Sequence, residues 1–250
     1  MTTATRSTAG RARRGGGKAR LDREAIVAAG LKLAAKPGVG SVSVRDLGAE
    51  LGADPTAIYR HFRGKDDLMR SLLDEVIGMS LQRVEAEPDD WRGRLTQLAV
   101  ATLEMFATYP AIGVEATVLT TGGPHELDVI ELMLDAFSRA GLEGDDLVNH
   151  YALLASHSLS SAAGIARNRS ERGADPSAAS AWIESPLLVD PAQHPLIASL
   201  GPRLRALDDR YLFMIGVESI LDSAERTAAV KRGREAKTAD AADSSPAADA

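Results

Sequence analysis

Residues 54–65, DPTAIYRHFRGK, carry side chains that can recognise nucleic acid. Ile58 and Phe62 are four residues apart, so on a helix both point into a core while the positions between them face elsewhere. Lys65 then starts another helix, where an ammonium group beside free backbone amides suits a phosphate. The outward positions supply hydroxyl, methyl, imidazole and guanidinium groups that can meet base edges or phosphates: Thr56, Ala57, Tyr59, Arg60 and His61.

Residues 43–52 predict the helix that supports this segment. Ser43 can cap the free amides, and Asp46 occupies the partner position of a capping box. Gly52 supplies the backbone freedom for a sharp turn, and Asp54–Pro55 is a start signal for the next helix. The sequence therefore predicts a helix-turn-helix whose second helix faces DNA. One apolar face of its first helix is formed at i, i+3 and i+7 by Val44, Leu47 and Leu51.

The order of a helix at 23–35, then SVSVRDLGAELG, then DPTAIYRHFRGKDDL resembles the DNA-binding domain of the TetR family of bacterial transcriptional repressors. The likeness is strongest over residues 21–72. Segments 91–103, 109–124 and 211–225 resemble the C-terminal domain of the tetracycline-repressor branch. The predicted DNA-contacting set, which from Arg45 onward matches operator-touching positions of the family, is Val44, Arg45, Pro55, Thr56, Ala57, Tyr59, Arg60, His61 and Lys65.

Charge separates the two ends of the chain. The net charge is −6 overall, yet residues 1–70 hold 14 Lys and Arg against 7 Asp and Glu. A local basic region is what a nucleic-acid surface requires, and here it coincides with the helix-turn-helix.

Four parts are expected. Composition predicts a disordered basic arm at 1–20 and a disordered tail at 226–250. The motif places the helix-turn-helix domain at 21–68, and the family resemblance implies a helical effector-binding and dimerisation domain at 69–225. The arm is either a solvated tail or a segment that follows the minor groove. Between the tails every periodic segment reads as helical, with a loop at about 168–195, so the fold class is all-α. Helices are expected at 92–109, 112–121, 126–140, 145–167 and 208–223.

Two late helices, at 145–166 and 208–223, are candidates for subunit association, because their small residues allow close approach. Packing within one subunit is the alternative. Family resemblance favours a homodimer, and two recognition helices about 34–36 Å apart would read a palindromic operator on double-stranded DNA.

A large helical domain behind a small DNA reader suggests a sensor for a small molecule. Bulky or polar residues on its apolar helices are candidates to line a cavity: Met105, Tyr109, Leu119, Met133, Phe137, Tyr151 and His157. For each residue alone, ordinary core packing is the competing interpretation. The tetracycline-binding branch has a His before its Gly-Thr-Arg-Pro-like turn where this chain reads VLTTGGP at 118–124, which favours an apolar or amphipathic effector over a tetracycline–magnesium chelate.

We expect a ligand-released repressor. The alternatives are an effector-independent DNA-binding protein and an enzyme, but no phosphate loop, nucleophile elbow or zinc-protease motif occurs. The chain has no cysteine, and neither His150 nor His157 has a carboxylate or third His at ligand spacing, so no metal or cofactor is expected. No membrane segment or signal peptide is recognisable, so the expected location is cytoplasmic.

Overall fold

The computed structural model describes residues 21–36, 39–172, 183 and 187–243, and every regular element within these ranges is a helix. The all-α prediction is confirmed. The predicted arm at 1–20 lies outside the described residues.

Three short helices form the N-terminal domain: α1 (Arg23–Ala34), α2 (Val44–Leu51) and α3 (Pro55–Ile58). Each begins at a side-chain cap, in which Asp22, Ser43 and Asp54 accept hydrogen bonds from backbone amides in the first turn. The turn between α2 and α3 depends on Gly52, whose φ of 59° is the left-handed conformation that glycine adopts without strain. The capping and turn signals in the sequence therefore produce the helix-turn-helix.

The second helix of this motif is short. Regular α-helix ends at Ile58, and residues 59–61 continue as tighter turns in which the amides of Arg60 and His61 donate to Ala57 and Ile58 carbonyls. Ile58 and Phe62 are 0% and 2% exposed, so both anchor the segment in the core as predicted.

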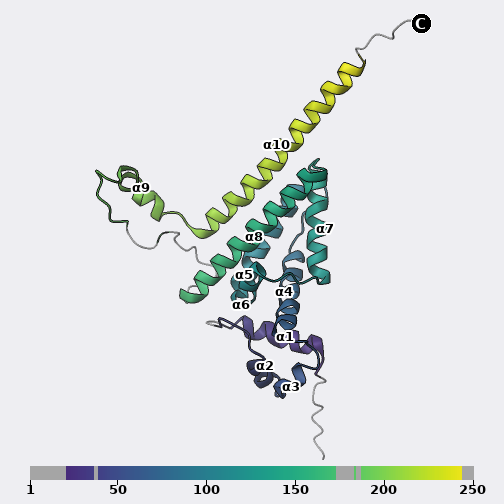
Figure 1. The fold of residues 1–250 in the computed structure, drawn as a ribbon, viewed down its shortest axis with the longest axis vertical. Coiled ribbons are helices and arrows are strands. Elements are labelled where there is room, and N and C mark those ends of the chain that lie inside the picture. Colours follow the sequence, from purple (N-terminus) through teal and green to yellow (C-terminus); the bar gives the residue numbers. More distant parts are fainter. Residues whose placement is uncertain (1–20, 37–38, 173–182, 184–186, 244–250) are drawn as a thin grey trace, which may run out of the picture.

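A long helix, α4 (Lys65–Leu81), leads from this domain into the larger one (Figure 1). Its buried residues Leu72 and Val76 pack into a single core with both parts of the molecule. The body continues with α5 (Trp91–Thr108), α6 (Pro110–Gly113), the 3-10 turn η1 (Val114–Thr117), α7 (Pro124–Arg139) and α8 (Gly144–Arg172). The helix expected at 112–121 is thus two short turns followed by irregular backbone.

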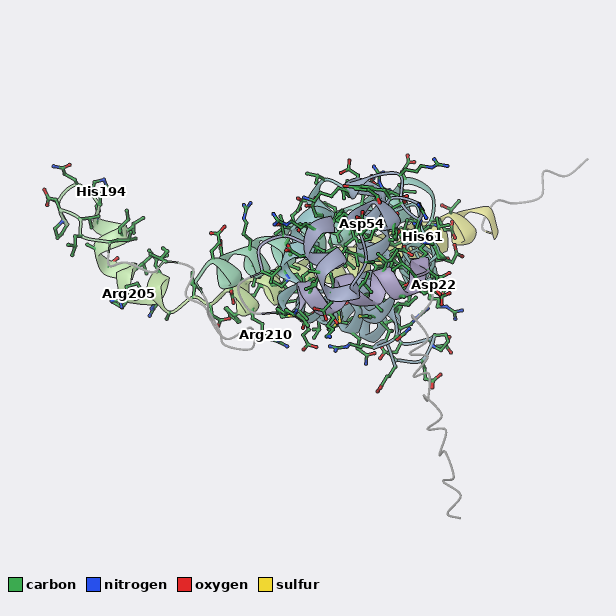
Figure 2. All side chains as sticks on the ribbon, turned by 90° about the horizontal axis from the view of Figure 1, so that it is seen from below. Asp22, Asp54, His61, His194, Arg205 and Arg210 are labelled. Carbon is green, nitrogen blue, oxygen red and sulfur yellow. The ribbon has the colours of Figure 1, made fainter. Side chains whose placement is uncertain are left out.

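The C-terminal part differs most from the sequence prediction. A helix that was not predicted, α9 (Pro195–Arg205), projects away from the body and buries no residue (Figures 1 and 2). The expected disordered tail at 226–250 is wrong through Asp243, because α10 (Asp209–Asp243) continues as one helix along α8 and beyond it (Figure 1). Ala224 and Ala228 of this helix are 0% and 1% exposed, so the body holds its middle turns.

No helix in the described part of the chain is both long enough and apolar enough to cross a lipid bilayer.

Candidate functional site

The start of α3 is fixed by Asp54 and Thr56. Asp54 accepts hydrogen bonds from the Thr56 amide at 2.8 Å and from its hydroxyl at 2.7 Å, and these bonds hold the pKa of Asp54 below its ordinary value. Because the Thr56 hydroxyl hydrogen is directed to Asp54, this side chain can offer a base its lone pairs and its methyl group but has no hydroxyl hydrogen left for a phosphate. Helices α2 and α3 form the lower end of the molecule in Figure 1, and Figure 2, seen from below, shows Asp54 and His61 in this region.

The structure brings most of the predicted DNA-contacting residues to this end. Tyr59 is 52% exposed although it is a large aromatic residue. Ala57 and His61 are partly buried, and the remaining exposed members of the set are Arg45, Pro55, Thr56, Arg60 and Lys65. Val44 is the exception, because it is only 9% exposed and belongs to the core cluster, so its inclusion in the DNA-contacting set is corrected. Its i, i+3 spacing with Leu47 already indicated an inward position.

Arg23 of α1 holds the end of the recognition segment against α4. Its guanidinium donates to the His61 carbonyl at 3.0 Å and to the Ser71 hydroxyl at 2.5 Å, and it lies 4.3 Å above the centre of the Phe62 ring. Asp67 completes this junction by accepting from the Arg63 amide at 2.9 Å and from Arg23 at 3.2 Å. These hydrogen bonds lower the pKa of Asp67, and the bond from the Arg63 amide has the largest effect. The orientation of the recognition segment is therefore tied to α4.

Sequence reasoning missed two cations beside Lys65. Arg63 and Arg70 are exposed and line the same surface hollow of about 440 Å³ at the start of α4. Their spacing around Lys65 was visible in the sequence, because positions 63 and 65 flank the helix start and position 70 follows within two turns.

A cavity of about 90 Å³ lies in the body between α4, α5, α7 and α8. Of the seven residues predicted to line it, only Met133 and Tyr151 do so. Met105 and Phe137 are buried elsewhere in the core, and Tyr109 and Leu119 pack against its edge. The walls are mostly apolar, and the polar residues among them are Ser80, Thr102, Glu126, Tyr151 and Ser158.

His157 lies outside the cavity and connects α8 to α10. Its Nε2 donates to the Phe213 carbonyl at 3.0 Å, and its ring stacks on the Phe213 ring with centroids 5.4 Å apart. His150 makes a similar connection, since its Nε2 lies 3.2 Å from the Ser223 hydroxyl. Both histidines thus hold the two helices together. The described residues also contain no cluster of three His, Asp or Glu that could bind a metal ion.

Glu126 and Ser158 are two cavity residues with a side-chain oxygen that forms no hydrogen bond to another described residue. Glu126 Oε2 accepts hydrogen bonds from the Gly122 amide at 2.6 Å and the Thr121 hydroxyl at 3.0 Å. Ser158 is 8% exposed, and its hydroxyl has no hydrogen-bond partner among the described residues. Desolvation, and secondly the charge of Glu126, raise the pKa of Tyr151. Neither Glu126 nor Ser158 was identified from the sequence, because a single polar residue on a helix gives no spacing pattern that would mark it.

Asp74 connects the cavity wall to α4. This residue is 7% exposed, and its carboxylate accepts hydrogen bonds from the Glu126 amide at 3.1 Å and the Thr121 hydroxyl at 2.9 Å. The first residue before α7 is Gly123, which has no capping side chain, so a carboxylate from a distant helix takes that role. The same helix α4 carries Lys65 and the Arg23 contacts at its other end.

The sequence matches two family descriptions. Residues 26–72 match bacterial regulatory proteins of the tetR family, and residues 85–227 match the Tetracyclin repressor-like, C-terminal domain. The chain is 30% identical over 216 residues to the HTH-type transcriptional repressor Rv1353c of Mycobacterium tuberculosis, covering 82% of this chain and 81% of that protein. It is 27% identical over 226 residues to the HTH-type transcriptional repressor DrrR1 of Streptomyces coeruleorubidus, covering 88% of this chain and 83% of that protein.

A solved structure has the same fold. The TetR-family protein ActR of Streptomyces coelicolor, crystallised with actinorhodin, superposes with a TM-score of 0.69 at 19% identity and covers 84% of this chain and 99% of its own. The matched family regions, the two repressor relatives and the exposed helix-turn-helix together place this chain in the TetR family of bacterial regulatory proteins, as a DNA-binding transcriptional regulator and not an enzyme.

Proposed function

We propose that the protein is a homodimeric repressor that binds a palindromic operator and is released by a small apolar or amphipathic effector held in the body. The observation that supports the proposal is the continuity of α4, which begins at Lys65 beside the recognition segment and, through Asp74, contacts the wall of the cavity. Two relatives are named transcriptional repressors, and ActR was crystallised with a small molecule. Because the target would be chromosomal DNA, the proposed place of action is the cytoplasm.

A dimer is supported by exposed stripes on two adjacent helices. On α8, Ala152, Ser156 and Ser160 are exposed at i, i+4 and i+8 and would allow a close approach by another helix. On α10, Tyr211 and Ile215 are 55% and 43% exposed and lie four residues apart on one face. Helices α8 and α10 run beside one another in Figure 1, so the two stripes can join the corresponding helices of a second copy in a four-helix interface.

The short recognition segment argues for a palindromic operator. A single α3 with its following turn reaches only a few base pairs, whereas two related by a twofold axis read half-sites about 34–36 Å apart. We assign base contacts to Thr56 and Ala57 and backbone contacts to Tyr59 and Lys65. The remaining proposed members of the interface are Arg45, Pro55, Arg60 and His61.

Release would follow from movement of α7 relative to α4. A cavity of about 90 Å³ is smaller than common ligand pockets of roughly 300–1,000 Å³, so a full-sized effector has to separate its walls. Any shift of the α7 N-terminus moves the amides that bind Asp74, and α4 transmits the change to the recognition segment. A coupling of about 1–3 kcal/mol would weaken operator affinity roughly 5- to 150-fold.

The same small cavity favours a second candidate, a repressor without an effector. In that case the cavity is a packing defect and α4 keeps one position. The effector-independent protein would bind its operator equally in the presence and absence of any metabolite.

Selection of bound duplexes from a random pool would provide an operator for the test. Gel-shift titrations of that operator in the presence of fractionated small-molecule extracts should reveal a fraction that lowers affinity at least about fivefold. Constant affinity across all fractions, with the selected operator still bound, would support the effector-independent repressor.

A further inference from the structure

The cavity in the body has one acidic group and no basic group among the described residues that line it. We propose that its ligand is an amphipathic cation: an apolar body with a protonated amine that binds the carboxylate of Glu126. The proposal rests on the effector function proposed above and specifies the chemistry of that effector.

Glu126 retains an unused acceptor. Both hydrogen bonds to its side chain, from Gly122 and Thr121, end on Oε2, and no described residue donates to Oε1. No Lys, Arg or His in the described ranges forms an ion pair with this carboxylate. A carboxylate beside apolar walls is stabilised when a cation or a strong donor replaces lost water. An ammonium group is a cation and also a strong hydrogen-bond donor.

Ser158 supplies a second, independent indication of a ligand. Its hydroxyl belongs to α8, on a different wall of the cavity from Glu126, and it is buried without a partner among the described residues. Buried polar groups in folded proteins are almost always hydrogen-bonded, so an unpartnered one in a cavity wall marks a position where a ligand atom can bind. A polar group on the ligand body would satisfy it.

The dimensions limit what the cavity accepts without rearrangement. A cavity of about 90 Å³ is well below the roughly 300–1,000 Å³ of common ligand pockets. A short alkylammonium is therefore the suitable probe, and a larger effector would insert its charged end first and separate the walls.

Thr121 connects cation binding to α4. Its hydroxyl has one hydrogen but two carboxylate acceptors, Asp74 at 2.9 Å and Glu126 at 3.0 Å. When a cation neutralises Glu126, this carboxylate becomes the weaker acceptor and the hydrogen goes to Asp74. The cation would thereby alter the contact that joins α7 to α4.

The test compares three four-carbon probes on the full-length protein: n-butylammonium, n-butanol and butyrate, titrated with ligand-observed NMR. The parent protein should bind n-butylammonium at least about tenfold more tightly than n-butanol, and butyrate least. Glu126→Gln keeps an oxygen that can accept from Gly122 and Thr121 but removes the charge, so it should abolish the preference for the cation. Glu131→Gln, an exposed neighbour on α7, is the matched control and should keep it.

The outcomes separate this inference from the effector function. Equal binding of n-butanol and n-butylammonium by the parent, or an undiminished preference in Glu126→Gln, would overturn the cationic ligand and leave an uncharged effector in place. No binding of any probe would overturn the cationic ligand, whereas the effector function is decided separately by the gel-shift titration with small-molecule extracts. If Glu126→Gln does not fold, the comparison of probes on the parent protein still decides the question.

Discussion

A single methyl group at Gly123 should break the contact between α4 and α7. A Cβ at this position would lie 2.3 Å from Cγ of Asp74 and 2.4 Å and 2.5 Å from its two oxygens, closer than real Cβ contacts. The backbone accepts alanine, since Gly123 has φ −84° and ψ 171°, which is ordinary extended geometry. The closest contacts are all with the Asp74 carboxylate, which has to move.

The size of the effect follows from the bonds that Asp74 loses. Its carboxylate accepts from the Thr121 hydroxyl at 2.9 Å, the Glu126 amide at 3.1 Å and the His125 amide at 3.4 Å. A hydrogen bond to a charged group contributes about 1.5–3 kcal/mol, so losing one or two gives a destabilisation of about 1.5–6 kcal/mol. For a domain of this size the unfolding midpoint should fall by roughly 3–24 °C.

Thermal unfolding followed by circular dichroism, at one protein concentration because a dimer is expected, measures this change. Gly201→Ala in α9 is the control, since its Cβ would meet nothing within 4 Å and alanine favours a helix. If the clash with Asp74 is the cause, Gly123→Ala should be nearly harmless in an Asp74→Ala background. An unchanged midpoint for Gly123→Ala in the parent protein would refute the reasoning.

Three further results are expected. Arg23→Ala removes the bonds to the His61 carbonyl and Ser71 and should lower the free energy of unfolding by about 1–3 kcal/mol, and a midpoint equal to the parent's would contradict the clamp. The depressed pKa of Asp67 means that its carboxylate stabilises the fold above its ordinary pKa near 3.8 and loses this contribution as pH falls through the lower folded value. Asp67→Asn should therefore be less stable than the parent at neutral pH and converge with it below about pH 4 in chemical denaturation curves. Lys65→Ala should weaken binding to all duplexes and reduce the slope of log affinity against log salt concentration by about one unit. Replacing Thr56 should instead change which sequence is preferred. The reverse pattern in filter-binding assays would contradict the roles assigned to these two residues.

The helix-turn-helix could be predicted because its signals are local. Ser43 and Asp54 cap the helices as expected, and Gly52 adopts the left-handed conformation that the turn requires. The inward positions of Ile58 and Phe62 follow from helical spacing and are confirmed by their burial. Short-range chemistry thus determines this domain almost completely.

The tail at 226–243 was predicted wrongly because its composition was weighed more than its helix propensity. Residues 226–243 are rich in alanine, the best helix former, but lack an apolar stripe and so resembled a disordered segment. In the structure Ala228 packs against the body and Lys231 forms an ion pair with Glu143, a residue distant in sequence. The helix α9 was missed although Pro195 marks its first turn, because its apolar residues have no core to enter.

The cavity could not be predicted because its walls come from four helices. Bulky side chains seemed the best candidates, yet Phe137 and Met105 fill the core, and smaller polar residues such as Ser158 line the space that remains. Which residues adjoin a void depends on how the helices pack, and a single sequence gives no signal for that arrangement.

The affinity ratio between a selected palindromic duplex and a scrambled duplex of the same length, measured at physiological salt with the full-length protein, tests the central claim most directly. The account predicts that the palindrome binds at least about 10³-fold more tightly, that one half-site alone binds much more weakly, and that two protomers occupy each palindrome. Equal affinity for the palindromic and scrambled duplexes would contradict it.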